Sequence, residues 1–261
     1  MSSAPQTSAA APWRAEFLSH LADTDTPLCV LSTLRPSSPP VPRARTVVFR
    51  GMWCSMPANP RNPAPRNPPV FESDHLTLTT DARMDKAREI VPSLAEGEVA
   101  GTGGGGAFEA VFWAPAAMTQ WRFSGTAYLL GPDVESGDVP AAAVREVLKR
   151  GMRRVGEGEF GWEKEVTAHF GNLSPLMRGT FRNPPSGKPV AEGDGGEGLK
   201  LGQRVEDLHD DVARRNFRVV VLVPEEVDKV DLSDSERGRR WRFRDVGGPD
   251  ESSWETVELW P

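Results

Sequence analysis

The sequence contains few of the residue types from which disulfide and metal sites are built. It has two cysteines, Cys29 and Cys54, and four histidines in 261 residues. Two cysteines cannot form a disulfide framework or a tetrahedral zinc site by themselves. The histidines nowhere have the spacing of metal ligands. We therefore expect reduced cysteines and no metal centre.

The sequence also lacks an excess of basic charge and any long apolar run. Its 37 acidic and 31 basic side chains leave a net charge of −6, which argues against a general nucleic-acid binder. No apolar segment approaches the roughly 20 residues that cross a bilayer, and the Ser/Ala-rich start has no basic segment followed by an apolar one. We expect a cytoplasmic protein with neither a membrane nor a nucleic acid as partner.

Short β-rich segments occupy both ends of the chain, and helical patterns lie between them. Trp13, Phe17 and Leu21 recur every four positions and predict a helix after Pro12. Further helices are expected after Asp81, as its cap, and over residues 139–155. The β-rich segments are 28–34, 45–50, 75–80, 108–113, 119–130, 217–223, 227–232, 241–244 and 254–261. Because no regular βαβ alternation appears, we predict a mainly β (α+β) fold, an antiparallel barrel or sandwich with peripheral helices.

The remaining segments set the expected domain organisation. Residues 1–11 are small and polar and predict a disordered tail, which leaves 12–261 as a single domain. A Pro/Asn-rich segment near 53–71 and a Gly-rich segment near 190–208 predict inserted surface loops. The glycine run at 101–106 precedes a strand and lacks the Lys-Ser/Thr ending of a phosphate loop. Gly125, inside a strand pattern, predicts a bulge.

Two segments combine groups that suit a phosphate or another anion. Arg43, Arg45 and Arg50 fall within eight residues that carry no acidic side chain. Such arginines bind an anion or protect an exposed strand edge from aggregation. Thr79 and Thr80 end a strand before a helix start that carries Lys86, so hydroxyls, backbone N–H groups and a cation lie together. A plain capped helix with a solvated lysine is the alternative.

Two strand patterns near the C-terminal half are further candidates. Gln120 lies within the 119–130 strand, where its amide either faces polar partners in the interior or faces water. Residues 239–243 alternate arginine with aromatic side chains, a pattern that binds anions, stacks on rings or closes a barrel edge.

In their order along the chain, these motifs resemble those of the pyridoxamine 5'-phosphate oxidase family, and more closely its related FMN-binding split-barrel subgroup. The motifs are Arg45-x-Val47-Val48-x-Arg50, Thr79-Thr80 before Lys86, Phe112-Trp113, Gln120-Trp121-Arg122-x-x-Gly125, Arg240-Trp241-x-Phe243 and Trp254-x4-Leu259-x-Pro261. Two further motifs resemble those of the subgroup and not those of the oxidase proper. They are Leu173-Ser174-Pro175-x-x-Arg178-x-x-Phe181 and Pro184-Pro185-x-Gly187. The resemblance covers most of residues 12–261 apart from the two insertions.

The resemblance implies a six-stranded antiparallel split barrel that forms a homodimer, with FMN in clefts between the subunits and a small molecule as substrate. Matched position by position, it implies FMN-binding roles for Arg45, Thr46, Val47, Val48, Thr79, Thr80, Lys86, Gln120 and Arg240. It implies substrate-binding roles for Arg50, Ser174 and Arg178. No catalytic side chain is identified.

Departures from the oxidase pattern leave the activity open. Met84-Asp85 replaces the Ser-Arg that precedes the phosphate lysine, and an aspartate beside a phosphate is unfavourable unless it points away. Phe170, Ser174 and Arg178 fall where the oxidase holds its substrate phosphate with Tyr, Arg and Ser, and the late Arg-x-His element is missing. We expect an oxidoreductase in which FMN accepts a hydride. The alternatives are an FMN-binding or interaction module without turnover and a split barrel that has lost the ligand.

Overall fold

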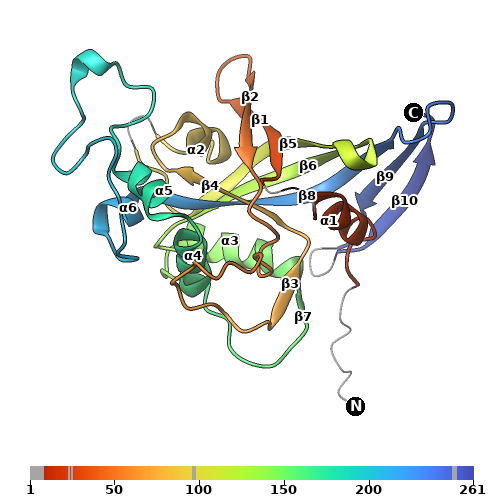
Figure 1. Ribbon diagram of the computed structural model, residues 1–261, viewed down its shortest axis with the longest axis horizontal. Coiled ribbons are helices and arrows are strands. Elements are labelled where there is room, and N and C mark those ends of the chain that lie inside the picture. Colours follow the sequence, from red (N-terminus) through yellow and green to blue (C-terminus); the bar gives the residue numbers. More distant parts are fainter. Residues whose placement is uncertain (1–8, 23, 25, 96–97, 249–251) are drawn as a thin grey trace.

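The computed structural model describes residues 9–22, 24, 26–95, 98–248 and 252–261 (Figure 1). Most of the predicted tail, residues 1–8, lies outside this range. At its end Ala11 is buried, and its N–H donates a hydrogen bond of 3.0 Å to Asp74 Oδ2. The packed part of the chain therefore begins before Pro12. No helix in the described residues is long and apolar enough to cross a membrane.

The main sheet is antiparallel throughout. Its eight strands are β1 (Leu28–Arg35), β2 (Val41–Val48), β4 (Leu76–Asp81), β5 (Gly103–Ala114), β6 (Thr119–Leu130), β8 (Phe217–Asp231), β9 (Arg239–Asp245) and β10 (Trp254–Leu259). They lie in the order β10-β9-β8-β6-β5-β1-β2, and β4 pairs with β8 beside this path. The β8, β9 and β10 ends form an arm that extends away from the helices at the opposite end of the molecule (Figure 1).

A short irregular junction links the two ends of this sheet. Residues 50–53, which follow β2, bond to the start of β4: Arg50 N to Thr77 O at 2.8 Å and Trp53 N to His75 O at 2.9 Å. The strands β1, β2, β4, β8, β6 and β5 therefore surround one interior, while ladder pairing is interrupted between β2 and β4. This agrees with the expected mainly β, six-stranded split barrel.

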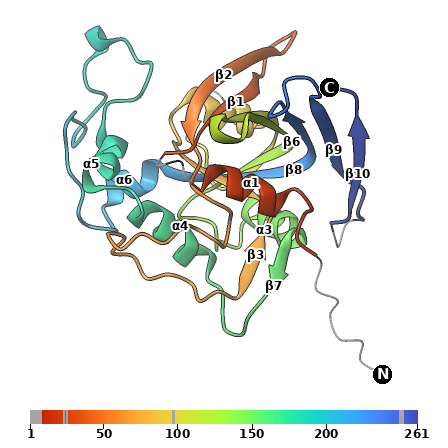
Figure 2. The same ribbon diagram turned by 45° about the vertical axis from the view of Figure 1, so that its right-hand side comes forward.

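The helices are short and lie around the sheet. They are α1 (Arg14–Leu21), α2 (Asp85–Ile90), α3 (Val139–Arg150), α4 (Trp162–Gly171), α5 (Pro175–Gly179) and α6 (Asp211–Asn216), with 3-10 turns η1 (Pro115–Ala117), η2 (Thr180–Arg182) and η3 (Val190–Glu192). A two-stranded sheet pairs β3 (Phe71–Ser73) with β7 (Met152–Arg154) beside α3 (Figures 1 and 2). The predicted helix 139–155 is therefore too long, because it ends at Arg150 and the chain returns as a strand.

Two hydrophobic clusters lie on opposite faces of β8. Val220 and Leu222 face the barrel interior, where Phe17 of α1 packs against one ring directly after β2 and three rings from β5 and β6. Val219 and Val221 face the second cluster, which contains α3, α4 and Trp53. A strand buried on both faces reads as a continuous apolar run. This explains the sequence from 217 to 223, and the two strands predicted over 217–232 form one strand.

Residues 53–71 were predicted to form a surface loop, but part of this segment is buried. Trp53 and Val70 are fully buried, and the Trp53 ring stacks on His169 of α4 with centroids 5.8 Å apart. Prolines prevent a helix or a ladder in this segment, but they do not keep its apolar side chains from packing. The segment therefore forms part of the second core.

The glycine run is not a loop before β5 but the start of that strand. A Cβ atom at Gly106 would lie against the carbonyl oxygen of Glu89 and 2.8 Å from the Cα atom of Ile90, both in α2. The missing side chain lets α2 approach the strand backbone. The other expected glycine, Gly125, lies at a register shift between β6 and β8 and confirms the predicted bulge.

We expect Gly106→Ala to destabilise the fold by about 1–3 kcal/mol, because the added methyl group must push α2 away from β5. The midpoint of urea unfolding measures the change. Gly137→Ala is the matched control, since a Cβ atom there meets nothing within 4 Å. Equal stability of the two variants would contradict the close packing of α2 on β5.

Candidate functional site

A cavity of about 880 Å³ lies between the β2–β4 edge of the barrel and the segment that follows α5. The first half of the chain lines it with β2, the end of β4 and the start of α2. The second half lines it with Met177, with Thr180 and Phe181 of η2, and with parts of residues 183–201. Segments far apart in sequence therefore meet at one cavity.

Seven of the twelve predicted site residues line this cavity. They are Thr46, Val47, Val48, Arg50, Thr79, Thr80 and Lys86. They come from three places in the sequence, and the barrel brings them together because residues 50–53 bond to β4.

The turn between β4 and α2 shapes one end of the cavity. Asp81 was expected to cap α2, but the helix begins at Asp85, and Asp81 instead binds Arg83. The guanidinium of Arg83 donates to Asp81 Oδ1 at 2.9 Å and to Asp81 Oδ2 at 2.6 Å. This double contact leaves Lys86, one turn further along, facing the cavity.

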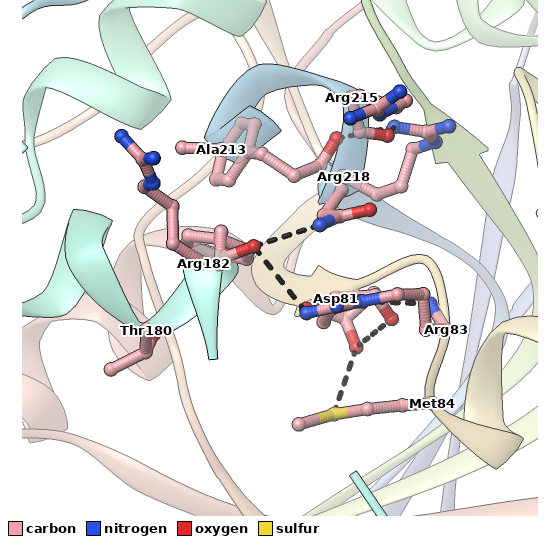
Figure 3. Close-up of polar contacts among 12 residues, drawn as sticks. Asp81, Arg83, Met84, Thr180, Arg182, Ala213, Arg215 and Arg218 are labelled. Carbon is pink, nitrogen blue, oxygen red and sulfur yellow. Dashed lines mark hydrogen bonds and ion pairs between the residues drawn. The ribbon is translucent and has the colours of Figure 1, made fainter. Parts of the chain in front are cut away.

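Arg83 also ties the two walls of the cavity together (Figure 3). Its Nη2 donates to the carbonyl oxygen of Phe181 at 3.3 Å, and Asn216 Nδ2 donates to the same oxygen at 2.8 Å. The backbone oxygen of Asn216 accepts from Ala82 N at 2.8 Å. One set of hydrogen bonds thus holds the turn after β4, η2 and the end of α6 together.

Lys86 is a cation without an acidic partner in the described residues. Its Nζ lies 3.1 Å from Thr80 Oγ1 and 3.1 Å from Met84 Sδ. Burial lowers the pKa of Lys86, and the nearby charge of Arg45 lowers it further. Asp85 points away, with its carboxylate exposed and 3.7 Å from Arg35. The ammonium group is therefore free to pair with an anion in the cavity.

Arg50 is a second cation of this kind. Within the described part of the chain its guanidinium makes no ion pair, and its buried Nε has no hydrogen-bond partner. Burial lowers the pKa of Arg50 below its ordinary value. Because an unpaired buried donor is costly, a ligand acceptor at this wall of the cavity would relieve the cost.

Arg45 lies beside the cavity instead of in its wall. Its Nη2 pairs with Glu89 Oε2 at 2.5 Å, and its Nη1 donates to the hydroxyl of Thr33. The side chain lines a neighbouring hollow of about 460 Å³, which shares Met84, Lys86 and Ser186 with the main cavity. Arg45 and the main cavity thus lie on two sides of Lys86.

The other four predicted residues do not line the cavity. Gln120 and Arg240 lie on β6 and β9, opposite Val230 of β8 on its two sides, and Arg240 pairs with Asp228 at 2.8 Å. Ser174 caps α5 by accepting from Met177 N at 3.3 Å. Arg178 is buried at 2% exposure, with Glu206 at 3.8 Å. The substrate-binding roles that the resemblance implies for Ser174 and Arg178 therefore remain predictions, and neither side chain lines this cavity.

Sequence reasoning missed the part of the wall that the second half of the chain supplies. This part includes Thr180, Asn183, Lys188 and Lys200. Two quoted motifs were the available signals, because Phe181 ends one and Pro184 begins the other, and both residues line this wall. Neither residue carries chemistry by itself. No group of three or more His, Cys, Asp or Glu side chains in the described ranges could hold a metal ion.

Comparison with curated proteins finds a relative that matches part of the chain. A curated relative, an uncharacterized protein of Saccharomyces cerevisiae, is 30% identical over 100 residues, which are 38% of this chain and about a third (34%) of that protein.

A solved structure at low sequence identity shares the fold. A pyridoxamine 5'-phosphate oxidase-related, FMN-binding protein from Nostoc punctiforme PCC 73102 superposes with a TM-score of 0.58 at 20% identity, over 97% of this chain and 99% of that one. PhzG from Burkholderia lata 383, solved with tetrahydrophenazine-1-carboxylic acid, gives a TM-score of 0.43 at 14% identity, over 95% of this chain and 90% of that one.

Residues 10–131 match the family described as pyridoxamine 5'-phosphate oxidase, FMN-binding domain. They include β1, β2, β4, α2, β5 and β6, and hence the first-half wall of the cavity. This segment, a little under half of the chain, is what the protein shares with the pyridoxamine 5'-phosphate oxidase FMN-binding domain family.

Proposed function

We propose that this protein is an FMN-dependent oxidoreductase acting on a small molecule. The observation that carries the proposal is the single cavity of about 880 Å³ at which seven predicted residues meet. A cavity of this size falls within the range of small-molecule and cofactor sites. When bound, FMN supplies hydride acceptance and passes the electrons to a second acceptor.

The residues present suit FMN at both ends. The Lys86 ammonium and the Thr80 hydroxyl, 3.1 Å apart, would hold the phosphate, because neither is committed to an acidic side chain in the described residues. Thr46, Val47 and Val48 would offer strand backbone and apolar side chains to the flavin ring. Arg50 would hold an acceptor group of the flavin or of the substrate.

The proposal stops short of pyridoxamine 5'-phosphate oxidation. Of the three predicted substrate residues, Arg50 lines the cavity whereas Ser174 and Arg178 do not. This observation favours a second candidate, an FMN-binding module without turnover. Reduction of bound FMN by a small donor and its reoxidation in air would separate an oxidoreductase from such a module.

We further propose a homodimer in which the partner completes the cofactor site. One row of paired residues crosses six strands: Thr46, Val30, Val111, Arg122, Asp228 and Arg242. Paired residues share a face of the sheet, so the cavity residue Thr46 shares its face with exposed Val30. Gln120 and Arg240 lie on that face too, two residues along their strands from Arg122 and Arg242. A second copy on this face would bring them to the partner's cavity.

We expect purified protein incubated with FMN to show the visible absorbance of bound flavin. Lys86→Ala should weaken FMN binding about tenfold or more, because a charge-assisted hydrogen bond is lost, and should leave riboflavin binding nearly unchanged. Fluorescence titration measures both affinities. Lys149→Ala, on the exposed side of α3, is the control. A protein that stays colourless with FMN present would overturn the cofactor proposal.

We expect Trp113→Glu to convert the dimer to a monomer and to weaken FMN binding. Trp113 is paired with Gln120 and is 46% exposed on the proposed interface, where a buried charge is costly. Light scattering after size exclusion measures the mass. Val139→Glu is the control, because Val139 is 81% exposed on α3. A wild-type protein that is monomeric and still binds FMN would contradict a site composed of residues from two subunits.

A further inference from the structure

A buried carboxylate lies beside the proposed phosphate end of the cavity. Glu89, on the second turn of α2, is 2% exposed. Its Oε2 accepts from Arg45 Nη2 at 2.5 Å and from the hydroxyl of Thr33. Its Oε1 is buried without a partner. Burying a carboxylate in this way is costly unless it is paired. The ion pair with Arg45 therefore offsets the cost of burying Glu89.

The pairing also fixes Arg45. Glu89 and Thr33 occupy Nη2 and Nη1 of the guanidinium, and the Arg43 carbonyl oxygen accepts a further bond from Nη1 at 3.3 Å. Nε donates no hydrogen bond in the described part of the chain. The Arg45 side chain remains 23% exposed and lines the hollow that it shares with Lys86. One edge of the guanidinium is held, and a donor is left over beside the ammonium group.

Glu89 also adjusts the charge at this place. Burial lowers the pKa of Lys86 and Arg45 lowers it further, whereas Glu89 and Asp81 act in the opposite direction. Without the carboxylate, two cations would face each other and the long arginine side chain would be free to move away. With it, the arginine side chain is held beside Lys86.

We propose that Glu89 is a positioning residue for phosphate binding, which holds the Arg45 guanidinium next to Lys86 so that both contact the phosphate of the cofactor. This inference rests on the proposed function, since it takes FMN as the ligand of the cavity. The competing explanation is that the Glu89–Arg45 pair has only a structural role and stabilises the packing of α2 on the end of the barrel. The two differ in what the loss of Glu89 does to a ligand that lacks the phosphate.

The test compares FMN with riboflavin, which has the same ring and no phosphate. In Glu89→Ala, Arg45 loses its anchor, and we expect the ratio of FMN to riboflavin affinity to fall about tenfold, the loss of one charge-assisted hydrogen bond. In Glu89→Gln the amide oxygen still accepts from Arg45, so the ratio should stay at or above that of the wild type. Fluorescence titration gives both affinities for each variant.

Glu165→Ala is the matched control. Glu165 is also buried, at 5% exposure, and its carboxylate accepts from Asn67 Nδ2 at 2.9 Å. Its partner Asn67 lines neither cavity, whereas Arg45, the partner of Glu89, lines the smaller one. We expect this variant to lose stability without a change in the affinity ratio. Parallel losses of FMN and riboflavin binding in Glu89→Ala, or a gain in FMN affinity there, would overturn the positioning role.

A flavin-free probe separates this inference from the cofactor proposal. If the wild type binds neither FMN nor riboflavin, the proposed function fails, and pyrophosphate then decides the role of Glu89. We expect pyrophosphate to raise the unfolding temperature of the wild type and of Glu89→Gln, but not that of Glu89→Ala. The same shift in all three proteins, or no shift in the wild type, would refute the role of Glu89.

Discussion

The candidate site depends on how closely α2 approaches the strand β5. Gly106 has no side chain to hold the helix off, and the backbone of Glu89 and Ile90 fills the place where a Cβ atom would lie. Because α2 is only six residues long, it cannot be stable by its own hydrogen bonds and takes its position from this packing. The contact therefore fixes Lys86 toward the cavity and Glu89 toward Arg45 at the same time.

The opposite wall of the cavity is fixed through β8 instead. This strand separates the two hydrophobic clusters. Asn216, the last residue of α6 and the one directly before β8, donates to the Phe181 carbonyl oxygen, which also accepts from Arg83. Movement of η2 would break bonds to both the β4–α2 turn and β8. The wall from the second half of the chain is thus coupled to the barrel by a few polar contacts, whereas the first-half wall belongs to the barrel itself.

The periodic parts of this fold could be predicted from the sequence. Phe17 and the strand residues around Thr46 and Thr79 show their structure locally, since spacing and β-branched side chains report which face is buried. The prediction of a surface loop failed for Trp53, because a proline-rich composition indicates the backbone conformation of a segment and not the burial of its side chains. Asp81 was misplaced because its partner Arg83 is held by Phe181, 98 residues further along. A contact of that range leaves no local trace in a single sequence.

Some of the residues that line the cavity could likewise be predicted from the sequence, and others could not. Thr46, Thr80 and Lys86 share one cavity because the barrel brings β2, β4 and α2 together, as the family resemblance implies. Met177 and Lys200 come from segments without regular pattern, and their place follows from tertiary packing alone.

The distribution of charge explains why an acidic protein can carry an anion site. Two acidic side chains at the cavity or beside it are paired, Asp81 with Arg83 and Glu89 with Arg45. Asp194 also lines the cavity, but the wall has five cationic side chains: Arg50, Arg83, Lys86, Lys188 and Lys200. Lys86 and Arg50 keep no acidic partner in the described residues, so the cavity is locally positive while the whole chain has a net charge of −6. The proposed homodimer would add a constraint, because an isologous interface repeats every contact. If Gln120 and Arg240 of one subunit reach the partner's cavity, the reverse contact follows, and a single interface forms two equivalent sites.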